Sequence, residues 1–329
     1  MTWFDLNEEQ LREYRVTTPE PPELDAWWTG RIERARRRAQ PASVVRHQDE
    51  LYGELPVYDV EFSGDDGERV HAWYLRPVGT EDAGGGEPLP VVVTFLGYGA
   101  DRGLPVEHTA VPVAGYAQLV VDTRGQGGAL TRDTADPGAG PQYPSLITRG
   151  ILDPDTYYYS RVYVDAVRAV DTAAELPGVD PELIAVSGAS QGGGLALAAA
   201  ALSGDLVKVC QADVPFLCDF QRAITVSPAT PYAEIARYIA AHPRTEERVR
   251  DTLRYVDAAL LARRITADTL VTVGLMDEIC PPSTVYGAFH EIGATREIHP
   301  SPFRGHPIPR SYADVMEHTL RHLRTHLKR

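Results

Sequence analysis

Ser190 lies at the centre of Gly188-Ala-Ser-Gln-Gly192, which has the spacing of a nucleophile elbow. An apolar run ending near Val186 precedes it and an Ala/Leu-rich run follows it, so we expect a strand, a sharp turn and a helix. Glycines at these two positions let the strand and the helix pack closely, and the turn lifts the serine hydroxyl clear of the sheet. This context favours a nucleophilic serine over an ordinary glycine-rich turn.

A serine nucleophile requires a base within hydrogen-bond reach and an acid that orients the base. In α/β-hydrolases both follow the serine in the chain, each on a loop after a strand. Asp277 comes just after the apolar run 268–274, and His306 lies in the loop after the next predicted strand, 294–299. We therefore expect Ser190, Asp277 and His306 to form a catalytic triad.

Three nearby residues compete for the roles of acid and base. Glu278 follows Asp277 directly and has the character of a solvated surface carboxylate. His290 falls within a predicted helix and His299 within a predicted strand, where packing or surface roles explain them. Asp277 and His306 remain the favoured pair.

The last predicted helix carries His318, His322 and His326 at helical spacing. Histidines one turn apart are the spacing of a metal ligand pair. No cysteine or carboxylate converges on them in the sequence, so a polar helix face is favoured. We expect no metal and no organic cofactor.

An oxyanion formed at the serine needs backbone N–H donors. The first is expected from Gln191, at the start of the helix after the elbow, and the second from the loop after the apolar run 90–96. Tyr98 is the candidate in that loop, because glycines on both sides let its backbone approach a substrate.

Strand and helix patterns alternate along most of the chain and predict an α/β-hydrolase fold, with a mostly parallel central sheet covered by helices on both faces.

Residues 1–40 form a predicted N-terminal helical extension, in which Trp27 and Trp28 are expected to be packing anchors rather than a sugar platform. Residues 214–265 lack strand patterns and are expected to be a helical insertion that caps the pocket. We expect one domain spanning 1–329. The expected strands are 56–62, 69–76, 90–96, 117–122, a run ending near 186, 206–213, 268–274 and 294–299.

The composition of the chain limits the kinds of function and location that it can have. The 329 residues carry a formal net charge of −14 and no long basic block, which disfavours a nucleic-acid partner. Three cysteines without metal spacing, and an amino terminus without a secretory pattern, indicate a cytoplasmic protein. No apolar run approaches about twenty residues, so we expect no membrane-spanning segment.

The chain resembles carbohydrate esterase family 7, which comprises acetyl xylan esterases and cephalosporin C deacetylases. The residues that carry the resemblance are Arg124-Gly-Gln-Gly127, the elbow 188–192, Thr148–Tyr159, Gly274–Ser283 and the late glycine–histidine pair 305–306. The likeness runs from the N-terminal helix to the last helix.

The resemblance implies Ser190 as nucleophile, Asp277 as orienting acid and His306 as base, with Tyr98 and Gln191 as oxyanion donors. Arg124 and Gln126 are then scaffold residues that hold the active-site loops. Family members are usually hexamers that act on small acetylated molecules. One departure is Pro307, which stands where the family has glutamate after the histidine and restrains the backbone of that loop.

Two other functions fit the same sequence. The same scaffold serves aminopeptidases and thioesterases, although no propeller-sized extra domain is present here. The second is a protein that keeps the hydrolase fold as a binding module, with its catalytic activity weakened by Pro307.

Overall fold

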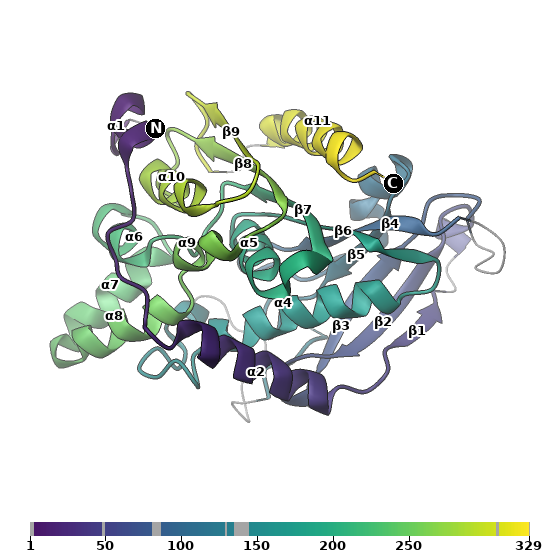
Figure 1. Cartoon of the computed structure of the whole chain (residues 1–329), viewed down its shortest axis with the longest axis horizontal. Helices are drawn as coiled ribbons and strands as arrows, with labels where there is room; N and C mark the ends of the chain where they lie inside the picture. Colours follow the sequence, from purple (N-terminus) through teal and green to yellow (C-terminus); the bar gives the residue numbers. More distant parts are fainter. Residues whose placement is uncertain are drawn as a thin grey trace.

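The computed structural model describes residues 3–47, 50–80, 87–128, 130–134, 145–306 and 309–328. Within these residues nine strands form one sheet in the order β1-β2-β3-β5-β4-β6-β7-β8-β9 (Figure 1). The strands are β1 (Ser43–Arg46), β2 (Val57–Ser63), β3 (Arg69–Leu75), β4 (Leu89–Phe95), β5 (Ala117–Val121), β6 (Val179–Ala189), β7 (Val207–Asp213), β8 (Asp268–Gly274) and β9 (Arg296–Ser301).

The sheet is mostly parallel, as the sequence predicts. From β5 through β9 every neighbouring pair is parallel, whereas β1, β2 and β3 form an antiparallel edge that joins β5. The edge strand β1 is not predicted by the sequence, because four residues without a buried face carry little periodicity. Strand β6 runs to Ala189, three residues beyond the expected end, so it leads directly into the elbow.

Helices cover both faces of the sheet, which confirms the predicted fold class. On β4, Val91 and Val93 belong to the apolar core that α4 and α5 complete, whereas Val92 packs with residues of α3 and α11 on the other side. The helices are α1 (Glu8–Glu13), α2 (Leu24–Arg38), α3 (Ala110–Val113), α4 (Tyr158–Glu175), α5 (Gln191–Ser203), α6 (Phe220–Val226), α7 (Tyr232–Ala241), α8 (Glu246–Tyr255), α9 (Ala258–Leu261), α10 (Pro282–Glu291) and α11 (Pro309–His326).

The N-terminal helix α2 packs along α4 on the outside of the molecule (Figure 1). Trp28 is buried, stacks on Tyr163 of α4 at 5.7 Å and donates its indole N–H to the Tyr255 carbonyl at 2.8 Å. Trp27 meets Trp28 edge-on at 4.8 Å. Both tryptophans are packing anchors, as the sequence predicts.

Residues 214–265 contain α6 to α9 and, as expected, no strand. Their first residues lie beside the elbow, because the Phe216 N–H donates to the Ser190 carbonyl at 2.9 Å. In the parts of the chain that the structure describes, no helix has the length and apolar character needed to cross a membrane.

Candidate active site

Ser190 occupies the turn between β6 and α5 with φ 58° and ψ −120°. A non-glycine residue adopts such a positive φ rarely and at a cost in strain. The turn is held from both sides, because the Ser190 N–H donates to the Asp213 carbonyl at 2.9 Å and the Ser190 carbonyl accepts from the Phe216 N–H.

The glycines on either side of Ser190 leave room for neighbouring backbone. A Cβ on Gly192 would lie 2.2 Å from the Phe95 carbonyl oxygen, and one on Gly188 would lie 2.4 Å from the Gly192 backbone. Both glycines are therefore sterically required.

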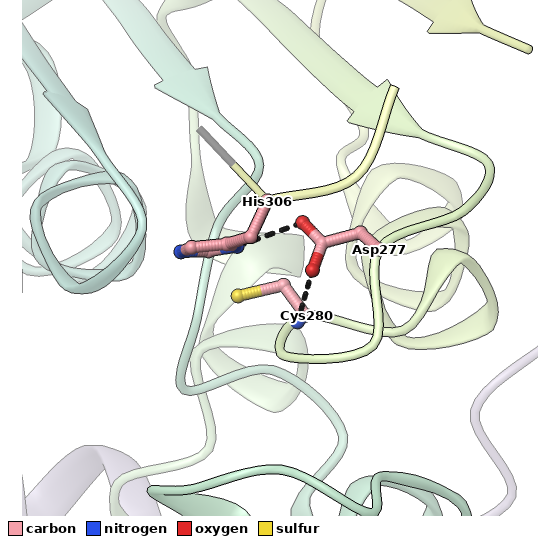
Figure 2. A group of neighbouring side chains, drawn as sticks. All are labelled: Asp277, Cys280 and His306. Carbon is pink, nitrogen blue, oxygen red and sulfur yellow. Dashed lines mark hydrogen bonds and ion pairs between the residues drawn. The ribbon is translucent and has the colours of Figure 1, made fainter. Parts of the chain in front are cut away.

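The structure brings Ser190, His306 and Asp277 together. The His306 Nε2 lies 2.9 Å from the Ser190 Oγ. Its Nδ1 lies 2.8 Å from Asp277 Oδ2 (Figure 2). Because a carboxylate only accepts, Nδ1 carries the ring proton and Nε2 is free to take the serine proton. Asp277 is fully buried, and its second oxygen accepts the N–H groups of Ile279 and Cys280 at 2.9 Å each. The rival Glu278 makes no such contact with the imidazole.

Cys280 is a residue of this site that the sequence does not single out. Its thiol lies below the imidazole of His306 in Figure 2, with the sulfur within 4.8 Å of an imidazole nitrogen. The thiol also contacts the Ser190 side chain. Burial, together with the Asp277 charge, raises the pKa of this thiol well above its usual value, so the sulfur stays protonated. Cys280 is thus a neutral, close-packed neighbour of the reacting groups.

The donor atoms of Asp277, Cys280 and His306 lie within 4.8 Å of one another, a spacing compatible with a metal ion. An ion at this position would have to break the His306–Asp277 hydrogen bond and deprotonate a thiol whose pKa is raised. The hydrogen bonds already present account for the cluster without a metal.

Two glutamines hold the loop that carries Tyr98 against the start of α5. Gln126 and Gln191 exchange side-chain amide hydrogen bonds of 2.8 and 3.2 Å, and both are completely buried. Gln126 Oε1 also accepts the Gly99 N–H at 2.6 Å, and Gln191 Nε2 donates to the Leu96 carbonyl at 3.2 Å. The backbone of Tyr98 is therefore fixed on both sides, next to the helix start that provides the Gln191 N–H.

Tyr158 and Tyr159 complete the support of this amide pair from α4. The Tyr158 hydroxyl accepts from Gln126 at 2.8 Å and donates to the Arg124 carbonyl at 2.6 Å, and the Tyr159 hydroxyl donates to Gln191 Oε1 at 2.9 Å. Burial raises the pKa of both phenols, so each remains a neutral donor. The sequence alone assigns these hydroxyls no role.

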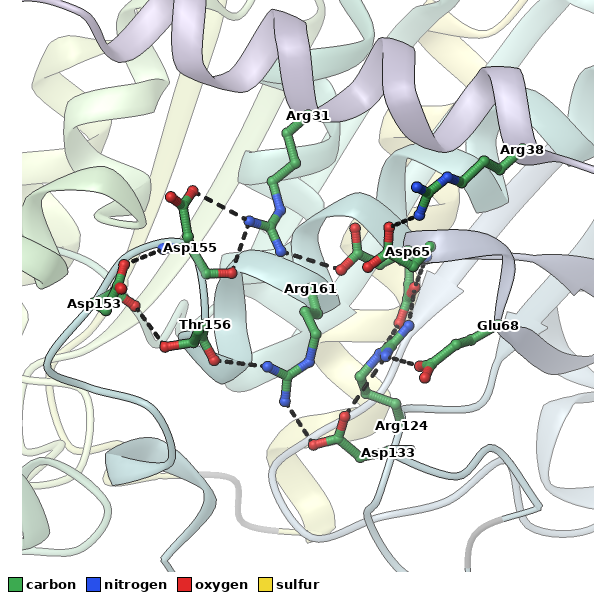
Figure 3. A network of polar contacts seen from close by, with 12 residues as sticks. Arg31, Arg38, Asp65, Glu68, Arg124, Asp133, Asp153, Asp155, Thr156 and Arg161 are labelled. Atoms are coloured by element: carbon green, nitrogen blue, oxygen red, sulfur yellow. Dashed lines mark hydrogen bonds and ion pairs between the residues drawn. The ribbon is translucent and has the colours of Figure 1, made fainter. Parts of the chain in front are cut away.

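Arg124 anchors a buried ion-pair network behind the site (Figure 3). Its guanidinium makes two hydrogen bonds to Asp165, of 2.6 and 2.7 Å, and a third to Glu68. Burial opposes the charged form, but Asp165 and Glu68 outweigh it and raise the pKa of Arg124. The network reaches α2, where Arg31 donates to Asp65 at 3.1 Å.

The loop that carries His306 is fastened by Arg304, which the sequence does not single out. Arg304 makes a bidentate pair with Asp213, at 2.8 Å for each hydrogen bond, and both residues are buried. The Asp213 carbonyl is also the acceptor for the Ser190 N–H. Asp213 therefore connects the turn that carries Ser190 to the loop that carries His306, through its backbone carbonyl on one side and its carboxylate on the other. Pro307, predicted to restrain this loop, lies outside the described residues.

A cavity of about 370 Å³ lies on the α3 and α11 face of the sheet. Its lining includes Gly188, Ala189 and Asp213 but not Ser190 or His306. The cavity therefore backs onto the elbow and is separate from the position of the reacting carbonyl.

A family model and a curated relative match this chain in sequence. The family described as acetyl xylan esterase (AXE1) matches residues 1–323. The chain is 30% identical over 294 residues to the acetyl esterase Axe7A of Xylanibacter ruminicola; the match covers 88% of this chain and 64% of that protein, so the chain spans less than two thirds of this relative.

Two solved structures superpose over nearly the whole chain. The acetyl xylan esterase from Paenibacillus sp. R4 has a TM-score of 0.87 and 36% identity, covering 96% of this chain and 99% of that one. Acetyl xylan esterase 1 from Thermoanaerobacterium sp. JW/SL YS485 has a TM-score of 0.86 and 32% identity, covering 96% and 98%. The chain therefore belongs to the acetyl xylan esterase family.

Proposed function

We propose that this protein hydrolyses acetyl esters through an acetyl-enzyme on Ser190. The observation that carries the proposal is the single imidazole of His306, at hydrogen-bonding distance from both Ser190 Oγ and buried Asp277. Membership of the acetyl xylan esterase family supports acetyl as the acyl group.

In the proposed mechanism, His306 Nε2 takes the proton from Ser190 Oγ as the oxygen bonds to the acetyl carbon. The backbone N–H groups of Gln191 and Tyr98 stabilise the oxyanion. His306 then gives its proton to the departing sugar oxygen, which leaves an acetyl-serine. A water molecule, deprotonated by the same imidazole, releases acetate and restores the hydroxyl. Asp277 keeps Nδ1 protonated and stabilises the imidazolium throughout.

We propose small acetylated sugars and xylo-oligosaccharides as substrates, and the acetyl ester of cephalosporin C as a further one. The acetyl xylan esterases that superpose on this chain support the first group, and the family resemblance supports the second. An acyl pocket fitted to a methyl group discriminates by about 1–3 kcal/mol per added methylene. Propionyl and butyryl esters should therefore react progressively more slowly.

The test is a substrate panel run on the wild type, Ser190→Ala and a matched control, Ser203→Ala. Ser203 is a buried serine at the end of the same helix, and its hydroxyl has no hydrogen-bond partner in the described structure. We expect Ser190→Ala to abolish hydrolysis of acetylated xylo-oligosaccharides and 4-nitrophenyl acetate, and Ser203→Ala to retain it. Activity of Ser190→Ala at the wild-type rate would contradict the nucleophile assignment.

The same panel separates the alternatives. Faster turnover of amino-acid anilides or acyl-CoA than of acetyl esters would indicate a peptidase or a thioesterase. Failure of a fluorophosphonate to label Ser190 would indicate a binding module without chemistry.

We infer a single domain, supported by the buried ion pair between Arg31 of α2 and Asp65, which belongs to the network around Arg124 (Figure 3).

Three buried free cysteines support a reducing, cytoplasmic location. We infer a hexamer from the family resemblance; the described residues include exposed large apolar side chains, among them Leu104, Val106, Val113 and Phe303. Light scattering on the full chain tests the assembly.

A further inference from the structure

The histidines of α11 have neighbours that the sequence alone does not reveal. Helix α11 packs against β7 and β8 (Figure 1), and the edge strand β9 lies next to β8. This packing places Glu297 and His299 of β9 in one groove with His318, His322 and His326, and Asp268 of β8 against His326. The carboxylates that the linear sequence lacks around these histidines therefore come from other elements.

Pairwise contacts show how closely these groups approach. The ring centroids of His299 and His318 are 4.8 Å apart, and those of His322 and His326 are 4.5 Å apart. Glu297 Oε1 lies 2.7 Å from His299 Nε2. Four imidazoles and a carboxylate line one groove of about 220 Å³ between β9 and α11.

This donor set suits a divalent transition-metal ion. Imidazole nitrogen and carboxylate oxygen are the ligands that Zn²⁺ accepts in tetrahedral sites, and histidines one helical turn apart chelate it. Asp268 Oδ2 lies 3.1 Å from His326 Nδ1, so this fourth imidazole already has a carboxylate partner and stays outside the ligand set. Arg321, the cation on this groove, is paired with Glu317.

We propose that the groove between β9 and α11 binds one Zn²⁺-type ion, with His299, Glu297, His318 and His322 as ligands. Among the described residues, Asp277, Cys280 and His306 are the three side chains whose donor atoms all lie within 4.8 Å of one another. The groove side chains must therefore rotate to close on the ion, and the 2.7 Å contact between Glu297 and His299 must open. Binding would clamp α11 to β9, the strand that leads into the His306 loop. The ion has no part in the acyl transfer.

The test uses the full-length protein without a polyhistidine tag, in chelator-treated buffer. Titration calorimetry with ZnCl₂ should show one equivalent bound, and the thermal midpoint should rise with Zn²⁺ concentration. Co²⁺ should give the visible absorption of a tetrahedral centre. Absence of binding heat at millimolar Zn²⁺ overturns the proposal.

Variants locate the ion. His318→Ala and Glu297→Gln change exposed side chains, so folding should survive, and each should weaken Zn²⁺ binding at least about 10-fold. His242→Ala, an exposed histidine at the end of α7, is the matched control and should bind like the wild type. His306→Ala should also retain Zn²⁺ binding.

Loss of Zn²⁺ binding in His306→Ala, with retention in His318→Ala, would place the ion at the catalytic group and refute the groove site. Acetyl ester hydrolysis should be unchanged in His318→Ala, so failure of this proposal is distinguishable from failure of the esterase assignment.

Discussion

At the scale of single residues, Ser190 reaches its base through a backbone conformation that serine rarely adopts. Hydrogen bonds to Asp213 and Phe216 hold the strained turn, and glycine is required at 188 and 192 because any Cβ would meet backbone atoms. The hydroxyl therefore points at His306 in the absence of substrate, which lowers the entropy lost in reaching the transition state.

Asp277→Asn tests the orienting role at this scale. The amide would donate to Nδ1, so Nε2 would carry the ring proton and lose its ability to take the serine proton. We expect kcat for an acetyl ester to fall by about 10⁴-fold. Glu278→Gln, the neighbouring carboxylate, is the control and should stay close to the wild type. Equal losses in the two variants would show that Asp277 is not the orienting acid.

At the scale of elements, the site depends on contacts that join the ends of neighbouring strands. Arg304, two residues before His306, is bound to Asp213 at the end of β7. The Gln126–Gln191 pair joins the loop after β5 to the start of α5, and Gln126 also accepts the Gly99 N–H from the loop after β4. These contacts hold the base, the nucleophile and the proposed oxyanion donors in one frame.

Arg304→Met tests the fastening of the base loop. The change leaves the Asp213 carboxylate buried without its cation, which costs about 3–5 kcal/mol of unfolding free energy. We expect that loss in urea unfolding, together with a lower kcat. Adding Asp213→Asn should recover part of the stability, because the unpaired charge is gone.

Arg37→Met is the control for this experiment. Arg37 pairs with Glu33 on the exposed side of α2, and such surface pairs contribute about 0–1 kcal/mol. A wild-type unfolding curve for Arg304→Met would refute the proposed anchoring.

At the scale of the whole molecule, the insertion is joined to the catalytic core through a second strained segment. Val214, Leu217 and Asp219 all have positive φ values, of 39°, 68° and 44°. Asp257, from the end of the insertion, accepts the backbone N–H groups of Asp219 and Phe220 at 2.7 and 2.9 Å. Burial, with the Asp219 charge beside it, raises the pKa of Asp257 to about 7.

This raised pKa predicts how stability depends on pH. The folded protein keeps a proton on Asp257 that the unfolded chain releases near pH 4, so its stabilising effect is complete below about pH 4 and is lost as pH rises through about 7. We expect the unfolding free energy to fall over this range, by at most about 1.4 kcal/mol per pH unit from this group.

Urea unfolding at several pH values measures that slope. Asp257→Asn should flatten it, whatever the absolute stability of the variant. Asp251→Asn, an exposed carboxylate on α8, should leave the slope unchanged. A wild-type slope in Asp257→Asn would assign the pH dependence to other groups.

Much of this molecule follows from local sequence patterns. Strand, elbow and helix are signalled by residues close together in the chain, and the order Ser190, Asp277, His306 follows from where the apolar runs end. Those patterns also predict the helical insertion and the packing role of Trp28. They are readable because periodicity and glycine spacing depend on neighbours within a few residues.

Other features depend on residues far apart in sequence that the fold packs together. Arg304 meets Asp213 across 91 positions, and His326 meets Asp268 across 58. Cys280 lies beside Ser190 although nothing around it marks a thiol at an esterase site. The register and crossing of the strands set these contacts, and no local periodicity encodes them. For this reason the catalytic order could be predicted from the chain, whereas the groove of histidines and carboxylates required the packing of α11 against the sheet.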